Sequence, residues 1–212
     1  MYTIKEGLSW NKIIEFYNLY EKFVDDFKQK AKIFDDNEKI ADELVIIRYA
    51  LLNPFFTLKD RFIILYENNS IIGFQCINLD IKETSFKQAT FGALYISPEH
   101  RKIITIDDKT TYSVAHLRDF AYNIMDNENV TIVHTSTHKL LIKNILMYLR
   151  EGFIPYKRDT QGIIDMVKDR QYRLPKEELY KLTNELKNTG TVPLIDVHSN
   201  QYSLKFKNKS TK

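Results

Sequence analysis

Residues 130–159, VTIVHTSTHKLLIKNILMYLREGFIPYKRD, carry the most informative pattern in the chain. The opening VTIVHT is rich in β-branched residues and predicts a strand. KLLIKNILMYLREG then places apolar residues at helical spacing and stops at Gly152, a natural C-cap glycine. FIPYKRD returns to a strand pattern, and GIIDMVKD follows with another. The segment therefore predicts a strand, a helix and a pair of strands.

Two helices are predicted at the start of the chain. Ser9 can cap the first, whose apolar residues recur at helical spacing from Trp10 to Ala31. The second has its apolar stripe between Ile40 and Leu51. It ends before Pro54, because a residue that precedes proline avoids the helical region.

The pattern then changes to strands. RFIILYENNSIIGFQCINLDI has two β-rich runs around Asn68-Asn69, which predicts a hairpin because asparagine tolerates positive φ. Residues 88–96, QATFGALYI, predict a third strand. Asp107 or Asp108 can cap the helix that follows, whose apolar face runs to Met125.

This order of elements predicts an α+β (layered α/β) fold. With 212 residues, of which 43% are apolar, the chain can bury one sizeable core and still carry a small appendage. We expect a main domain at residues 1–169. Residues 170–212 are expected to form a C-terminal appendage, with a helix that starts at Pro175 and the extended ends VPLIDV and QYSLKF.

Charge and cysteine content limit the partners and the compartment. With 31 basic and 28 acidic residues, the net charge of +3 argues against a nucleic-acid partner. The single cysteine, Cys76, excludes a disulfide within the chain and indicates a reducing compartment, the cytoplasm. MYTIKEGLSW has no apolar leader, and the most apolar stretch, LVIIRYALL, is too short to span a membrane and carries Arg48.

Three segments together resemble the GNAT N-acetyltransferase superfamily over roughly residues 10–168. FIILYENNSIIGFQCINL is similar to the family's second and third strands, and FGALYISPEHRK to its fourth strand and the start of its cofactor loop. The segment from residue 130 is similar to the fifth strand, fourth helix and sixth strand. It contains the family's Tyr-x-x-x-Gly-Phe pattern as Tyr148, Gly152 and Phe153. The resemblance implies a central mixed sheet flanked by helices, with extra helices at the N-terminus.

The resemblance also implies an acetyl-CoA site with a degenerate pyrophosphate loop. The family's loop reads Arg/Gln-x-x-Gly-x-Gly/Ala, and here Arg101 matches its first position while Ile104 and Ile106 replace the glycines. The carboxylates of Asp107 and Asp108 would repel a pyrophosphate there. A remodelled loop could still offer side chains and amides at a later helix start. The candidate cofactor-binding residues are Arg101, Lys102, Lys109, Thr110 and Thr111.

By the same resemblance Tyr148 is the candidate catalytic acid, which protonates the departing thiolate. A packing role for this tyrosine stays open, since the chain has thirteen tyrosines. No carboxylate on the strand at residues 88–96 offers a general base. His134 and His138 lack a third ligand nearby in the sequence and are interpreted as loop or capping residues, so no metal site is predicted.

Two functions of different class remain open. The first is an acyltransferase that moves an acetyl group from acetyl-CoA to the amine of a small molecule or protein. The second is a catalytically inactive GNAT-shaped protein, a pseudoenzyme that serves in interaction or assembly through residues 170–212. The amino-acid composition suggests that an AT-rich genome encodes the chain. Together with the degenerate pyrophosphate loop, it would suit a phage virion component in that case.

Overall fold

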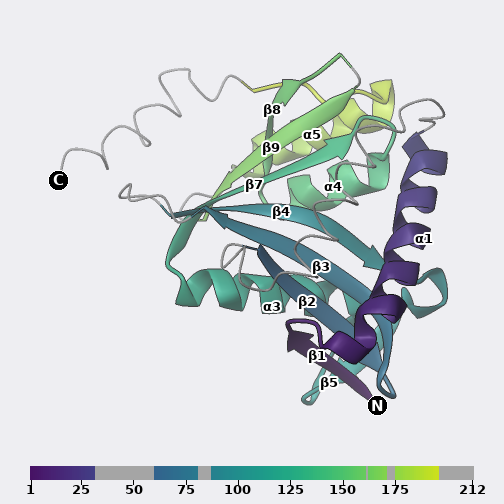
Figure 1. Cartoon of the computed structure of the whole chain (residues 1–212). Coiled ribbons are helices and arrows are strands. Elements are labelled where there is room, and N and C mark those ends of the chain that lie inside the picture. The colour runs from purple at the N-terminus through teal and green to yellow at the C-terminus, as the bar shows by residue number, and fades with distance from the viewer. Residues whose placement is uncertain (32–59, 81–86, 161, 171–174, 196–212) are drawn as a thin grey trace. The chain divides into compact units, whose positions relative to one another are not determined.

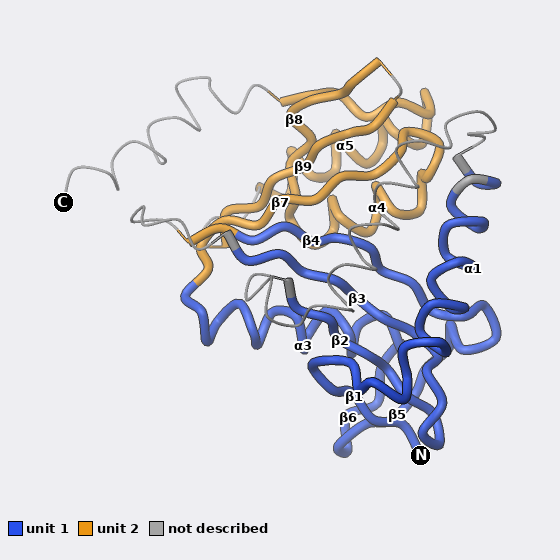
Figure 2. The backbone as a smooth tube through the Cα atoms, in the orientation of Figure 1, with its two compact units in different colours: residues 1–80, 89–129 blue, residues 81–88, 130–212 orange. Residues whose placement is uncertain are grey.

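The structure is a computed structural model that describes residues 1–31, 60–80, 87–160, 162–170 and 175–195 (Figure 1). The chain forms two compact units, shown in Figure 2. Unit 1 holds residues 1–80 and 89–129, and unit 2 holds residues 81–88 and 130–212. The domain boundary expected near residue 170 stays a prediction. The second predicted helix, at residues 40–51, lies outside the described residues.

Unit 1 contains a sheet in the order β1-β2-β3-β4, together with a separate β5-β6 hairpin. The sheet strands are β1 (Tyr2–Glu6), β2 (Asp60–Glu67), β3 (Ser70–Asp80) and β4 (Lys87–Ile96), of which residues 87–88 belong to unit 2. The hairpin strands are β5 (Ile103–Ile106) and β6 (Lys109–Tyr112). The helices are η1 (Trp10–Lys12), α1 (Ile13–Ala31), η2 (Pro98–His100) and α3 (Ser113–Asn127). The predicted first helix and first three strands are confirmed, whereas β1 was not predicted from its short sequence.

The sheet of unit 1 is covered on both faces. Ile64 and Tyr66 of β2 join a buried aromatic cluster with Phe16 and Tyr20 of α1. Neighbouring β2 residues alternate to the other face, where α3 contacts β2 and β3. Burial of consecutive residues in β2 therefore follows from helices on both sides of the strand.

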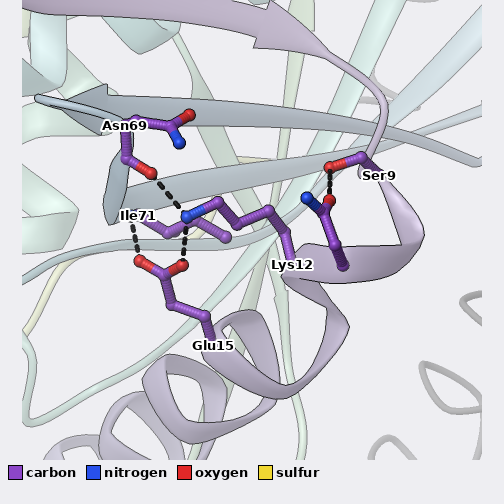
Figure 3. Close-up of polar contacts among 6 residues, drawn as sticks. Ser9, Lys12, Glu15, Asn69 and Ile71 are labelled. Atoms are coloured by element: carbon purple, nitrogen blue, oxygen red, sulfur yellow. Dashed lines mark hydrogen bonds and ion pairs between the residues drawn. The ribbon is translucent and has the colours of Figure 1, made fainter.

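The predicted β2–β3 hairpin turns at Asn68 and Asn69, whose φ values are +48° and +69°. The first turn of α1 is tied to this hairpin, as Figure 3 shows. Glu15 accepts a hydrogen bond from the Ile71 N–H at 2.5 Å, and Lys12 donates to the Asn69 carbonyl oxygen at 2.5 Å. Lys12 and Glu15 also pair with each other at 2.6 Å. These contacts fix the start of α1 against the turn.

Gly73 is required by the close approach of β3 and β4. A Cβ at this position would lie 2.9 Å from Ile96 Cγ1 and 3.0 Å from the Tyr95 carbonyl oxygen. Because one of these neighbours is backbone, Gly73→Ala is expected to lower the free energy of unfolding by about 1–3 kcal/mol, measured by urea denaturation. Gly92→Ala is the matched control, since its nearest neighbour is the Cys76 side chain at 3.3 Å. An equal or larger loss for Gly92→Ala would contradict the argument.

Unit 2 contains a sheet in the order β7-β9-β8, with antiparallel pairs. Its elements are β7 (Val130–His138), α4 (Ile142–Arg150), β8 (Ile154–Arg158), β9 (Ile163–Asp169) and α5 (Lys176–Thr189). α4 and α5 lie on one side of this sheet (Figure 1). The predicted helix stop is confirmed, because Gly152 has a φ of +91° and donates its N–H to the Leu149 carbonyl oxygen.

The described part of the predicted appendage packs within unit 2. α5 contacts α4, and Leu182 and Leu186 of α5 are buried. After α5, the Ile195 N–H donates to the Pro155 carbonyl oxygen at 2.8 Å, so the VPLI stretch lies along β8. QYSLKF lies outside the described residues. Among the described helices, none combines the length and apolar character needed to cross a membrane.

Candidate functional site at the start of α3

A β-hairpin occupies the segment where the glycine loop was expected. Asp107 and Asp108 form its two-residue turn, with φ values of +47° and +62°. Ile106 pairs with Lys109 on either side of the turn. A two-residue hairpin turn of this kind needs positive φ at both positions, which aspartate tolerates. The prediction of a helix capped by Asp107 or Asp108 is therefore wrong, and α3 begins at Ser113.

The hairpin packs alongside α3. The His116 ring lies 3.2 Å from the Ile104 carbonyl oxygen, and Lys109 pairs with Asp119 at 2.6 Å. Ile104 is buried. Asp108 is four residues before Tyr112, which corresponds to roughly 13 Å of strand. The two turn carboxylates are thus held at the far end of the hairpin from the first turn of α3.

The first turn of α3 is suited to an anion. Its N-cap residue, Tyr112, gives no side-chain cap, and the first turn has no acidic residue. The Ser113 N–H donates to the Lys102 carbonyl oxygen at 2.9 Å, and Ser113 Oγ donates to the His100 carbonyl oxygen at 2.9 Å. The N–H groups of Val114 and Ala115 come next, and the first N–H groups of a helix have no partner within it. Such groups and the positive end of the helix dipole attract phosphates.

Arg101 is held by neighbours within unit 1. Its Nε donates to the Ile96 carbonyl oxygen at 2.7 Å, and Nη2 lies 3.3 Å from Asp26 Oδ2. The guanidinium also lies 5.3 Å from the centre of the Tyr95 ring. Burial alone would raise the pKa of Asp26, but Lys30 and Arg101 together hold that pKa below its usual value. Arg101 thus joins the end of β4 to α1.

The other predicted cofactor residues are spread along the hairpin. Lys102 is exposed and contacts the helix start through its carbonyl group, with Nζ 6.0 Å from the centre of the Tyr2 ring. Lys109, Thr110 and Thr111 lie in β6. The expectation that these three begin the helix is therefore wrong, since their β-branched residues pair with β5 instead. Their binding to a cofactor stays a prediction.

Tyr148 lies in unit 2, on α4, and only 5% of it is exposed. Its ring meets Phe153 edge to face, with 5.3 Å between the ring centres. The contact joins the two aromatic residues of the Tyr-x-x-x-Gly-Phe pattern. It shows a packing role for Tyr148, and the catalytic role stays a prediction.

Two histidines lie in the middle and at the end of β7. The loop placement is wrong, because β7 continues past Thr135 to His138, which pairs with Ile163 of β9. The capping interpretation is confirmed for His138, whose Nδ1 accepts a hydrogen bond from the Leu140 N–H at 3.3 Å, just before α4. His134 is half-buried, and its Nε2 lies 3.2 Å from Gln88 Oε1. Burial lowers the pKa of His134, while the charge of Asp165 acts in the opposite direction. The period-two pattern of VHTST was the signal that could have extended the predicted strand toward His138.

Across the described ranges, no group of three or more His, Cys, Asp and Glu side chains is arranged to hold a metal ion.

Sequence comparison found no matching model of a protein family and no matching curated protein. Solved structures are similar in fold. The PaiA N-acetyltransferase of Thermoplasma acidophilum, in complex with coenzyme A, is 17% identical with a TM-score of 0.58, over 79% of this chain and 99% of that one. A GNAT-family acetyltransferase of Staphylococcus aureus is 16% identical with a TM-score of 0.57, over 80% and 99%. Arabidopsis thaliana Naa50, in complex with the bisubstrate analogue CoA-Ac-MVNAL, is 12% identical with a TM-score of 0.51, over 79% and 98%. These similarities confirm the predicted α+β fold class.

Proposed function

We propose that this chain, which has the fold of the GNAT N-acetyltransferases, transfers an acetyl group from acetyl-CoA to an amine. The observation that carries the proposal is the first turn of α3, which has no side-chain cap and no acidic residue. In the resemblance described above, the pyrophosphate of CoA binds at the start of the helix that follows the fourth strand. The first turn of α3 supplies N–H donors for such an anion. Neighbours of similar fold were solved with coenzyme A and with a CoA-linked peptide analogue.

The residues around this turn fit a pyrophosphate better than the sequence alone indicated. The sequence placed Asp107 and Asp108 where the phosphates would bind, whereas the hairpin carries both carboxylates away from the helix start. Lys102 is exposed next to Ser113 and can balance part of the phosphate charge. The replacement of the family's two loop glycines by Ile104 and Ile106 matters less for pyrophosphate binding, because these residues lie in β5 and not at the helix start.

In the proposed reaction the neutral amine attacks the thioester carbon of acetyl-CoA. A carbon–nitrogen bond forms, the carbon–sulfur bond breaks, and the thiolate of CoA leaves. Tyr148 would supply a proton to that thiolate from its phenol, and the proton that the attacking nitrogen loses on becoming an amide would restore the phenol. The acceptor is a small-molecule amine or a protein amine. The single cysteine, Cys76, cannot form a disulfide within the chain, which suits a reducing compartment such as the cytoplasm.

The assembly alternative has less support. It relied on free β-prone ends after residue 170, but Val192 is buried and Ile195 is bonded to Pro155 within unit 2. The remaining β-prone stretch, QYSLKF, lies outside the described residues. The pseudoenzyme and virion functions stay predictions.

Charge at the helix start provides the test of cofactor binding. Val114→Glu places a carboxylate in the first turn of α3, where it interacts favourably with the helix dipole and so leaves the helix stable. The same carboxylate would compete with a pyrophosphate for the N–H groups. We expect acetyl-CoA to bind the wild-type chain and Val114→Glu to weaken binding at least about tenfold, measured by titration calorimetry.

Val114→Gln is the matched control, because it has the same size without the charge. Binding by Val114→Gln within about twofold of wild type would assign the effect to charge. Absence of heat with the wild-type chain at millimolar acetyl-CoA would refute the proposed function. Equal weakening by both variants would refute the pyrophosphate position.

A further inference from the structure

One face of the β7–β9 sheet in unit 2 gathers polar side chains that the proposed site does not use. Residues of β7 and β9 alternate between the two faces of the sheet. Ile164 and Met166 are fully buried, on the face that also holds Thr135. Ser136 is exposed, and His134 and Asp165 are half-buried, on the opposite face. These three residues form what we name the β7–β9 polar face.

The contacts within this face centre on Asp165. Ser136 and Asp165 are direct cross-strand partners, and Ser136 Oγ donates to Asp165 Oδ1 at 2.7 Å. His134 is the diagonal neighbour of Asp165, since it pairs with Val167. Side chains at such positions are within reach of one another across a strand pair. Tyr156 of β8 also lies near, and burial followed by the charge of Asp165 raises its pKa.

Among the described residues, no lysine, arginine or histidine forms an ion pair with Asp165, although Lys157 of β8 is its cross-strand neighbour. Among the described residues, Ser136 and Lys157 lie directly opposite Asp165, His134 and His138 are its diagonal neighbours on β7, and Tyr156 lies near. A half-buried carboxylate with one hydroxyl donor retains acceptor capacity on its second oxygen. The group that matches this environment is a cation that carries N–H donors.

His134 has the properties of a proton acceptor. Its ring donates from Nε2 to Gln88 Oε1 at 3.2 Å, so the neutral ring presents Nδ1 as an acceptor. Because burial lowers its pKa from the ordinary 6.5, the ring is neutral near pH 7. A neutral imidazole beside a bound ammonium can remove the proton that prevents the amine from acting as a nucleophile.

We propose that the β7–β9 polar face binds a primary amine, with Asp165 and Ser136 holding the ammonium group and His134 taking its proton. The binding step is independent of the proposed function, whereas the proton step rests on it. In that step one proton moves from the ammonium nitrogen to His134 Nδ1, and the amine lone pair becomes available to attack the thioester. His134 returns the proton to water after the acetyl group has been transferred.

Binding is tested on the full chain by NMR titration with n-butylammonium. Tetramethylammonium is the probe control, because it has the charge but no N–H donor. We expect n-butylammonium to shift the resonances of β7 and β9 and tetramethylammonium to bind at least about tenfold more weakly. Asp165→Asn is expected to weaken n-butylammonium binding at least about tenfold and Ser136→Ala less, with Asp25→Asn of α1 as the matched exposed control.

The titration has defined results that would overturn the proposed amine binding. If n-butylammonium leaves β7 and β9 unchanged, or binds Asp165→Asn as tightly as wild type, the proposal is overturned. If Asp165→Asn does not fold, Ser136→Ala still tests the same contact, and unchanged binding by Ser136→Ala together with equal binding of tetramethylammonium would overturn it.

The proton step is tested with His134→Gln, which keeps a polar side chain of similar reach to Gln88. We expect n-butylammonium to bind this variant within about threefold of wild type, while acetyl transfer falls about 100-fold and loses the decrease in rate with falling pH that protonation of His134 causes. Wild-type transfer rates and pH profiles in both His134→Gln and Asp165→Asn would overturn this inference and leave the proposed function standing. Loss of amine binding in Asp165→Asn, in a chain that transfers no acetyl group, would support the binding site and refute the proposed function.

Discussion

Replacing Phe74 with alanine is expected to lower the free energy of unfolding by about 3–5 kcal/mol. Phe74 is fully buried on β3, and its ring centre lies 5.0 Å from that of Phe16 and 5.7 Å from that of Tyr20. Phe23 and Tyr95 complete the ring contacts, at 5.9 Å and 6.3 Å. The substitution removes the residue at the centre of this cluster and leaves a cavity between α1 and the sheet. Urea denaturation followed by circular dichroism measures the loss.

Phe23→Ala is the matched control for Phe74→Ala. Phe23 belongs to the same cluster, but it is only half-buried, at its rim. Its loss should therefore be smaller, about 1–2 kcal/mol, because less apolar surface returns to water. A loss below about 1 kcal/mol for Phe74→Ala would mean that the cluster closes around the vacated volume, which would contradict the rigid packing that we infer.

Replacing Tyr148 with phenylalanine is expected to reduce acetyl transfer about 100-fold while acetyl-CoA binding stays within about threefold of wild type. The variant keeps the ring that packs edge to face on Phe153 and removes only the hydroxyl group. The expected loss follows from the proposed role of that hydroxyl as proton donor to the thiolate. The measurement is the release of free CoA in the presence of an amine, followed with a thiol reagent.

Tyr180→Phe controls for the general effect of removing a phenol. Tyr180 lies on α5 and is 68% exposed, so the acetyl-transfer rate of Tyr180→Phe should equal that of wild type. A wild-type rate for Tyr148→Phe would assign Tyr148 to packing alone. The proposed function would survive that result, because acetyl transfer from a thioester to an amine can proceed with a proton from water.

Local chemistry was enough to predict most elements of this fold. The Asn68-Asn69 turn, the apolar stripe of α1 and the stop of α4 at Gly152 each depend on a few neighbouring residues. Asparagine and glycine adopt positive φ with little strain, and apolar spacing identifies the face that a helix buries. These features require no partner distant in the sequence.

The candidate site depended on contacts that the sequence did not reveal. Asp107-Asp108 can cap a helix or form a hairpin turn, and both are compatible with aspartate. Pairing of β5 with β6, together with the contact of His116 with Ile104, decided in favour of the hairpin. The predicted strand at residues 130–135 stopped short of His138 for a similar reason, because the extent of β7 is set by pairing with β9, about 30 residues later.

The sequence by itself therefore determined the order of the elements, the hairpin at Asn68-Asn69 and the Tyr-x-x-x-Gly-Phe pattern at Tyr148. Only the tertiary structure decided that α3 starts at Ser113 and that Asp165, Ser136 and His134 share one sheet face. The physical reason is the range of the interactions. Turn and helix preferences are properties of adjacent residues, whereas strand register brings together side chains that no local pattern relates.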